Sequence, residues 1–310
     1  MLQANRFKEL LGYIPTSVIN RKLRSTRDRS EIARFAKLAN DHPNFFDQVN
    51  AEVLVPTKFG FSIYCDRRDV IGLSIIKDGQ WEPLVSDTIC AILKPGDVAI
   101  DIGANMGYDA LLMSHLVGDT GMVIAFEPDL DNLSRFLRSV LVNRRTNIVV
   151  QSIALSDDVG KAIISTPPTE NLGTSNMRPS GASHGRPILT TKLDSLLRAK
   201  DFGRIKLVKM DVEGFEHKVL KGMSNLLDRI DYLTCEINHE FLKECGSSAK
   251  EIFDVLEPSG FTAYCAGFGE PGPWKKGDYT FAPAKKRAQG IAYDTIFARG
   301  RPAELAKLIE

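Results

Sequence analysis

Apolar residues in the first part of the chain follow two different periods. Within residues 1–50 they recur every three or four positions, which is the spacing of an amphipathic helix. They are Phe7, Leu10, Leu11, Ile14, Ile32, Phe35 and Leu38. Residues 52–64 instead place apolar positions on either side of the turn-like segment 57–60, which predicts a β-hairpin. We therefore expect a helical N-terminal extension over residues 1–50 and a separate domain from residue 51 onward.

From about residue 97, short apolar runs alternate with helical patterns. The apolar runs are residues 98–102, 122–126, 148–153, 205–210 and 232–237. The helical patterns are residues 108–116, 130–143, 215–221 and 249–256. Strands that are apolar almost throughout and alternate with helices are typical of a parallel sheet covered on both faces. The sequence therefore predicts an α/β fold with a doubly wound, mostly parallel sheet.

The end of the domain departs from this rhythm. The apolar runs 261–265 and 293–297 predict an antiparallel hairpin at one edge of the sheet. Residues 166–187 and 267–290 are rich in glycine and other loop-forming residues. Loops of such length inside a domain are usually functional or disordered, and we interpret these two as lids over a substrate. The domain thus spans residues 51–300, and residues 301–310 form a tail.

Composition and charge narrow the class of protein. The chain has 310 residues, of which 43% are hydrophobic and 25% charged, as in ordinary globular proteins. The net charge of +1 gives no support to a nucleic-acid partner. The N-terminus interrupts its apolar residues with charges, unlike a signal peptide, and no apolar run has the roughly 20 residues of a membrane span. The five cysteines form no CxxC pair, so we expect reduced thiols, a cytoplasmic location and no zinc site.

A glycine-containing turn follows the run 98–102 and has the sequence Asp101-Ile102-Gly103-Ala104-Asn105-Met106-Gly107. In an open α/β sheet, ligands bind beyond the carboxyl ends of the strands at a topological switch point. A dinucleotide site requires G-x-G-x-x-G, but here Asn105 and Tyr108 stand at the second and third glycine positions. The loop therefore favours S-adenosylmethionine, which has no pyrophosphate. Asp101 would meet its ammonium group, and loop amides its carboxylate.

The run 122–126 ends in Glu127-Pro128, about twenty residues after the loop. A carboxylate at this place can accept hydrogen bonds from both ribose hydroxyls of a bound nucleoside. S-adenosylmethionine and NAD sites share this geometry, so Glu127 alone does not separate a methyltransferase from a nicotinamide-dependent oxidoreductase.

At this point the sequence resembles the FkbM-type family of S-adenosylmethionine-dependent methyltransferases. The resemblance runs from about residue 79 to the last predicted strand, and its motifs occur in order at family-like spacing. The motifs are Lys94-Pro95-Gly96-Asp97, the 101–107 loop, Ala125-Phe126-Glu127-Pro128, Ala154-Leu155-Ser156-Asp157 and Lys209-Met210-Asp211-Val212-Glu213-Gly214-Phe215-Glu216.

The resemblance implies a Rossmann-like class I methyltransferase sheet, S-adenosylmethionine as methyl donor, and a hydroxyl acceptor on a sugar, glycan or polyketide-like metabolite. It also implies a cofactor site in which the loop lines the methionine end, Glu127 the ribose, and the end of the third strand the adenine. The expected cofactor residues are Asp101, Gly103, Ala104, Asn105, Gly107, Glu127, Pro128, Ile153 and Ala154.

Methyl transfer to a hydroxyl group requires a group that removes the proton. Candidates stand at the carboxyl ends of the fourth and fifth strands: Asp211 first, then Glu213 and Glu236, with His239 just beyond. Asp211 has the alternative role of capping the helix 215–221, and Glu213 the alternative of holding the turn. Oxygen ligands from Asp211, Glu236 and Asn238 would suit a magnesium ion, but we assign no metal.

Two functions of other classes remain open from the sequence alone. A nicotinamide-dependent oxidoreductase is disfavoured by the absent middle glycine, and a non-catalytic module that binds S-adenosylmethionine is disfavoured by the retained acids. The sequence identifies neither the acceptor, nor the oligomeric state, nor any partner of the basic stretch Arg21–Arg29.

Overall fold

The computed structural model describes residues 51–165, 176–178, 185–198, 203–265, 282–283 and 293–300. The predicted N-terminal extension and the predicted tail lie outside these ranges. So do most of the two segments interpreted as lids. No helix among the described residues is both long and apolar enough to cross a membrane, and the cytoplasmic location stays a prediction.

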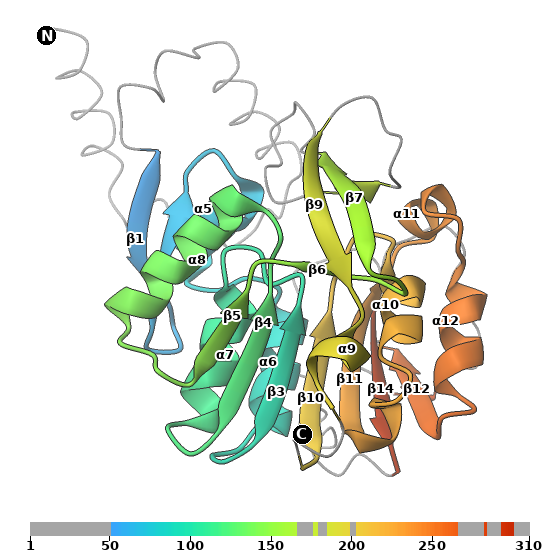
Figure 1. The fold of residues 1–310 in the computed structure, drawn as a ribbon. Helices are drawn as coiled ribbons and strands as arrows, with labels where there is room; N and C mark the ends of the chain where they lie inside the picture. The colour runs from blue at the N-terminus through green and yellow to red at the C-terminus, as the bar shows by residue number, and fades with distance from the viewer. Residues whose placement is uncertain are drawn as a thin grey trace, which may run out of the picture. The chain divides into compact units, whose positions relative to one another are not determined.

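An eight-stranded sheet forms the centre of the domain, in the order β13-β12-β14-β11-β10-β3-β4-β5 (Figure 1). Strands β5, β4, β3, β10 and β11 are parallel. Strand β14 pairs antiparallel with both β11 and β12, so β14 runs against the parallel strands and β12 runs with them. The strand bounds are β3 Val98–Ile102, β4 Met122–Phe126, β5 Ile148–Gln151, β10 Ile205–Met210, β11 Ile230–Ile237, β12 Phe261–Cys265, β13 Ala282–Pro283 and β14 Tyr293–Arg299. The order reverses between β3 and β10, which makes that point the topological switch of the sheet.

The apolar runs 261–265 and 293–297 form β12 and β14, which pair antiparallel as predicted, from Phe261↔Arg299 to Cys265↔Thr295. They are not simply appended to the edge, because β14 inserts between β11 and β12 and pairs with both. The predicted third strand is shorter than expected: β5 ends at Gln151, and residues 154–155 form β6 of a different sheet.

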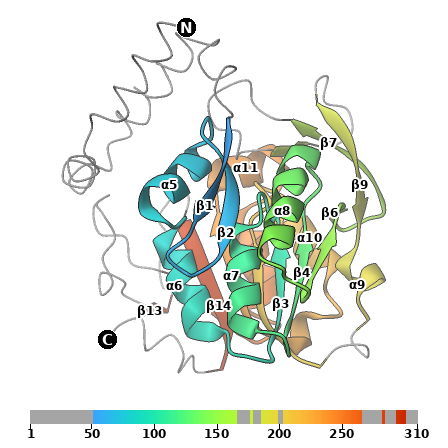
Figure 2. The same ribbon diagram turned by 90° about the vertical axis from the view of Figure 1, so that its left-hand side faces the viewer.

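Helices cover both faces of the central sheet, as the apolar runs predict (Figures 1 and 2). On one face, Ile100 and Ile102 of β3 join a core cluster with residues of α10 and α12. On the other face, Ala99 joins a cluster with residues of α5 to α8. The helices are α5 Val70–Asp78, α6 Pro83–Ile92, α7 Tyr108–Val117, α8 Leu130–Val142, α9 Leu193–Leu196, α10 Glu216–Gly222, α11 His239–Glu244 and α12 Ala249–Leu256, with a 3₁₀ turn at Leu227–Arg229. The alternation of side chains along each strand decides which residues meet each helical layer.

The predicted hairpin is present as β1 (Glu52–Pro56) and β2 (Ser62–Asp66), and it packs on α8. Glu52 forms ion pairs with Arg135 and Arg138 of that helix. Two α8 side chains also accept hydrogen bonds from the amides of β2: Asn143 from Ser62 at 2.8 Å, and Ser139 from Tyr64 at 3.0 Å. These polar contacts join the hairpin to the domain.

A second, four-stranded sheet in the order β6-β9-β7-β8 was not expected from the sequence. Its strands are β6 Ala154–Leu155, β7 Gly160–Ser165, β8 Asn176–Arg178 and β9 Arg186–Thr191. The prediction of residues 166–187 as a loop throughout is therefore wrong at β8 and at the first residues of β9. These strands are short and lack an apolar period, and they are held by pairing with β7. The second segment predicted as a loop, 267–290, also contains a strand, β13.

Gly107, at the N-terminus of α7, couples the cofactor loop to α8. Its φ is +88°, and a Cβ atom there would lie 2.0 Å from the ring of Phe136, a fully buried side chain of α8. Gly246 follows α11 with a φ of +76°, and a Cβ atom there would meet nothing within 4 Å. The amide of Ser247 donates to the carbonyl of Leu242 across Gly246, the hydrogen bond typical of a left-handed helix C-terminus. Both glycines thus have a positive φ, and they differ in the space around them.

We predict that Gly107→Ala lowers the free energy of unfolding by about 2–4 kcal/mol, because backbone strain adds to overlap with a ring that cannot move. Gly246→Ala should cost about 1 kcal/mol, from the backbone alone. Chemical denaturation of both variants measures the difference. Equal losses would show that Phe136 yields to the new methyl group.

Candidate active site

The loop that follows β3 is folded tightly against the ends of β4 and β10. Gly103 has a φ of +82°, and a Cβ atom there would lie 1.9 Å from the carbonyl oxygen of Asp211, so only glycine allows the two loops to approach this closely. The amides of Gly103 and Ala104 both donate to the carbonyl of Phe126 at 3.0 Å. Asn105 has a φ of 51°, a left-handed conformation that asparagine tolerates better than most residues. This conformation accounts for Asn105 at a position where dinucleotide sites carry glycine.

The amides of this loop already have acceptors within the protein. Asn105 donates to Glu127 Oε2, Met106 to Asn105 Oδ1, and the amide of Gly107 to the carbonyl of Ala104. The tight turn thus uses these amides to hold itself, and the binding of a ligand carboxylate by the loop stays a prediction.

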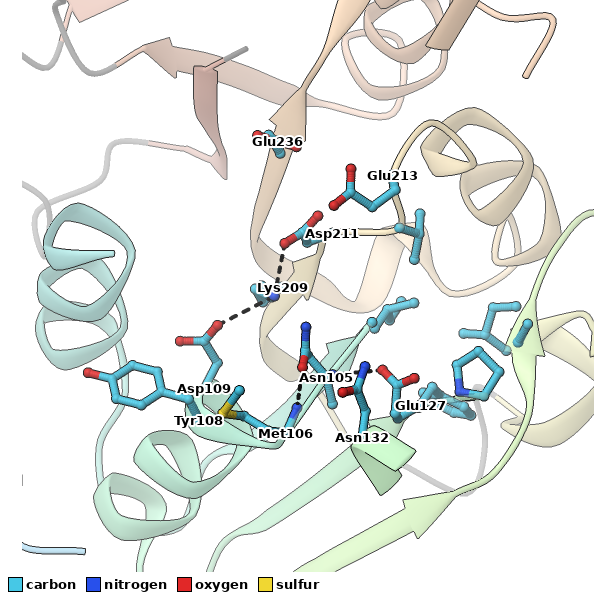
Figure 3. A pocket seen from close by; sticks show the side chains of 18 of the residues that line it. Asn105, Met106, Tyr108, Asp109, Glu127, Asn132, Lys209, Asp211, Glu213 and Glu236 are labelled. Atoms are coloured by element: carbon cyan, nitrogen blue, oxygen red, sulfur yellow. Dashed lines mark hydrogen bonds and ion pairs between the residues drawn. The ribbon is translucent and has the colours of Figure 1, made fainter. Parts of the chain in front are cut away.

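Glu127 follows β4 and lies buried in the wall of the same cleft (Figure 3). Its two carboxylate oxygens accept from the amides of Asn105 and Asp129, each at 2.7 Å. Burial raises the pKa of Glu127 to about 7, although these two amides act in the opposite direction. Each oxygen keeps a second lone pair, so the carboxylate can still accept a hydroxyl from a ligand.

The cleft extends along the carboxyl edge of the sheet, from the end of β5 to β11. Its lining includes most of the expected cofactor residues, namely Gly103, Ala104, Asn105, Glu127, Pro128, Ile153 and Ala154. Apolar side chains make up the wall around Ile153, namely Ile102, Phe126, Leu155, Ile164 and Val212. Trp81 and Glu82, which precede α6, line it as well. One part of the cleft is thus apolar and suits a flat ring, while Glu82 and the carboxyls of β10 and β11 make another part acidic.

The acidic part is organised around Lys209, a residue that the sequence analysis did not single out as functional. Lys209 stands opposite Asp101 in the register of β10 and β3. Its Nζ atom lies 3.4 Å from Asp109 Oδ2, 3.6 Å from Asp211 Oδ2 and 3.9 Å from Asp101 Oδ1. A lysine at a buried position of a mainly apolar strand is the signal that could have revealed it, since a buried ammonium requires a partner. Asp109, in the first turn of α7, was missed in the same way.

The turn between β10 and α10 presents Asp211 and Glu213 to the cleft (Figure 3). Helix α10 begins at Glu216, and no side chain caps its N-terminus, so Asp211 does not have the capping role. Glu216 holds the turn: its Oε1 atom accepts from the amides of Val212 and Gly214 at 3.3 and 3.1 Å. Glu213, with a φ of 53°, is left to face the cleft.

Burial changes the charge of the carboxyls around Asp211. It raises the pKa of Glu213 to about 8 and that of Glu236 to about 9, and in both cases Asp211 adds to the effect. Asp294, opposite Glu236 in the register of β11 and β14, has its pKa raised to about 7 by burial and by Asp211. At neutral pH, Glu213 and Glu236 are therefore mainly protonated and can donate hydrogen bonds.

Three of the predicted site residues lie outside the lining of the cleft. Asp101 is fully buried beneath it and faces Lys209. Gly107 packs against Phe136. His239 is the first residue of α11, and the structure does not place it among the lining residues.

The residues considered for a magnesium ion do not converge. The Oδ1 atom of Asn238 caps α11, accepting from the amides of Glu240 and Phe241. Across the described ranges, no group of three or more histidine, cysteine or acidic residues has the arrangement of a metal site.

The family model described as "Methyltransferase FkbM domain" matches residues 101–263, from the cofactor loop to β12. The hexuronic acid methyltransferase AglP of Haloferax volcanii is 29% identical over 182 residues, which cover 58% of this chain and 70% of that protein. The 31-O-demethyl-FK506 methyltransferase FkbM of Streptomyces tacrolimicus is 27% identical over 201 residues, which cover 55% of this chain and 74% of that protein.

Among solved structures, the methyltransferase FkbM of Methylobacillus flagellatus KT aligns with a TM-score of 0.39 at 16% identity. The alignment covers 66% of this chain and 43% of that one.

The methyl donor of this family, S-adenosylmethionine, fits the residues present. Its ribose needs a carboxylate such as Glu127, its adenine an apolar wall, and its ammonium and sulfonium groups a negative surface. One oxygen each of Asp109, Asp211 and Glu213 is buried and accepts no hydrogen bond within the described part of the chain, so the cleft has unused acceptors for such groups. The chain belongs to the FkbM family of methyltransferases and uses S-adenosylmethionine as its cofactor.

Proposed function

We propose that the protein transfers the methyl group of S-adenosylmethionine to a hydroxyl oxygen of a sugar or polyketide-like acceptor, with Asp211 as the proton acceptor. The observation that carries this proposal is the position of Asp211. It is the carboxylate at the carboxyl end of β10 that lines the cleft and also lies beside the ammonium of Lys209. Its neighbours Glu213 and Glu236 are mainly protonated at neutral pH, so neither competes for the role of base.

The relatives support the acceptor class. One is named for a hexuronic acid and the other for an oxygen of FK506, and neither name describes a nucleic acid. The net charge of this chain, +1, agrees with an acceptor that is not a nucleic acid. The proposal therefore includes a small-molecule or glycan partner.

For the cofactor, we assign the ribose to Glu127 and Pro128 and the adenine to Ile153 and Ala154. The loop residues Gly103, Ala104 and Asn105 would face the methionine part. Asp101 would not touch the ligand: it lies beneath the cleft and pairs with the ammonium of Lys209. Gly107 would act by letting α7 start against Phe136.

The bound cofactor supplies an activated methyl group on a sulfonium. The protein's part is to align the acceptor oxygen with that carbon, to exclude water and to remove one proton. The acceptor hydroxyl gives its proton to Asp211, and the oxygen electron pair forms the new bond to carbon while the carbon–sulfur bond breaks. Glu213 and Glu236, when protonated, donate hydrogen bonds that orient neighbouring oxygens of the acceptor. His239 lies outside this arrangement, and we give it no role in it.

The proposed function is tested by label transfer from methyl-labelled S-adenosylmethionine to a hexuronic-acid glycoside and to a 31-O-demethyl macrolide. We expect a methyl ether, which survives mild alkali. A methyl ester, which mild alkali hydrolyses, would contradict the role of Asp211, because a carboxylate acceptor needs no base.

We predict that Glu127→Gln lowers the affinity for S-adenosylmethionine by about 10- to 100-fold, because charge-assisted hydrogen bonds to the ribose are lost while one acceptor oxygen remains for the loop. Isothermal titration calorimetry measures the change, with Glu240→Gln on exposed α11 as the control. Affinity that stays at the wild-type level in a folded Glu127→Gln protein would remove Glu127 from the site. Titration with NAD should give no binding.

Asp211→Asn should lower kcat by about 100-fold or more while the Kd for S-adenosylmethionine stays within about threefold of wild type. The amide keeps the size of the side chain but cannot accept the proton. Steady-state kinetics and calorimetry together measure the effect, with the exposed Asp254→Asn on α12 as the matched control. Wild-type kcat in Asp211→Asn would exclude Asp211 as the base.

A further inference from the structure

Lys209 occupies the centre of the sheet at its carboxyl edge. In the register of the strands it stands between Asp101 of β3 and Thr234 of β11. Its side chain shares a face of the sheet with Leu207, which belongs to the core cluster containing residues of α6 and α7. Only 9% of the Lys209 side chain is exposed, so its ammonium is almost fully removed from water.

The three carboxylates around this ammonium differ in their access to the cleft. The side chains of Asp101 and Asp109 are 0% and 7% exposed, whereas that of Asp211 is 32% exposed. Figure 3 shows Lys209 between Asp109 and Asp211, with Asp211 directed toward Glu213. Asp101 therefore meets the ammonium from beneath the cleft, whereas Asp109 and Asp211 line the cleft and Asp211 is the most exposed of the three.

Apart from Lys209, the charged groups near Asp211 in the described part of the chain are acidic. Glu213 lies in the same turn, Glu236 is on β11 and Asp294 on β14, while Glu216 of α10 and Glu82 before α6 complete the surroundings. Lys209 is the single basic side chain in the described lining of the cleft. Without Lys209, the carboxylate of Asp211 would lie beside acidic groups and have no cationic partner in this lining.

A purely stabilising role explains this arrangement poorly. Taking an ammonium out of water is costly, and an apolar residue in its place is often as stable or more stable. Lys209 nevertheless contacts Asp211, the carboxylate that lines the cleft at the end of β10.

We propose that Lys209 is a positioning residue for methyl transfer: anchored by Asp101 and Asp109, it pairs with the carboxylate of Asp211 and directs it at the acceptor. The assignment of Asp211 as the base rests on the proposed function. The contact between Lys209 and Asp211 does not, and it can be tested without an acceptor.

The kinetic test is the pH dependence of kcat. In Lys209→Met, the acid limb of the profile should move to higher pH by about one unit, because Asp211 takes up its proton more readily. In Asp109→Asn the limb should move to lower pH, since a negative neighbour is gone. Lys209→Arg should restore much of the wild-type profile. Lys206→Met, on the same strand but paired with Asp231, is the control and should leave the profile unchanged.

Opposite shifts in Lys209→Met and Asp109→Asn are not expected of a merely structural role, which would lower kcat at every pH without moving the limb. A limb that stays in place in both variants would overturn the proposal. If Lys209→Met fails to fold, Lys209→Gln, which also removes the positive charge, replaces it with the same expected shift of the limb.

The second test measures thermal stability at pH 8 without any acceptor. Lys209→Met leaves Asp211 among acids only, so adding Asp211→Asn to it should raise the Tm by about 5 °C. Asp211→Asn in the wild-type background should raise it by less or lower it. Equal effects in both backgrounds would show that Lys209 does not act on Asp211. This result stands whether or not methyl transfer to a hydroxyl is observed, so failure of this inference is distinct from failure of the proposed function.

Discussion

The ammonium of Lys209, buried among Asp101, Asp109 and Asp211, is the interaction on which the site depends. It links β3, β10 and α7 at the switch point of the sheet. Asp101 and Asp109 bring two of the negative charges there, and burial raises the pKa of Asp101 to about 7 even though Lys209 opposes the rise. Lys209 in turn has a pKa well above its ordinary value, because its three carboxylates outweigh the burial of its ammonium. Each of these buried charges would carry a large desolvation cost if its partners of opposite sign were removed.

Around this centre, the backbone places the remaining parts of the site within reach of one ligand. The carbonyl of Phe126 fixes the start of the 103–107 loop, and Glu127 fixes its middle through the amide of Asn105. Gly103 allows that loop to touch the turn that carries Asp211. The apolar wall and the acidic wall are therefore both built from the strand ends of one sheet and the loops that follow them. For this reason, removal of a single side chain need not abolish the cleft.

The sequence predicted the parts of the fold in which local pattern and burial agree. The bounds of β3, β4 and β10 follow directly from their apolar runs, and the loop and Glu127 were found because a turn and a strand-ending acid carry a recognisable chemistry. Helices α5 and α6 were missed, as was the small sheet of β6 to β9, whose short strands depend on pairing rather than on periodicity. Lys209 was missed because its partners come from three elements, and only the register of β10 on β3 brings Asp101 to it. For the same reason, Glu216 rather than Glu213 proved to hold the turn.

The central claim is that the cleft at this switch point holds S-adenosylmethionine with its reactive end toward Asp211. A crystal structure of the protein with S-adenosylhomocysteine tests it most directly. The account predicts the ribose hydroxyls within hydrogen-bond distance of Glu127, the adenine against Ile153 and the sulfur on the side of the cleft that carries Asp211. A ribose bound away from Glu127, or a sulfur facing away from Asp211, would contradict it.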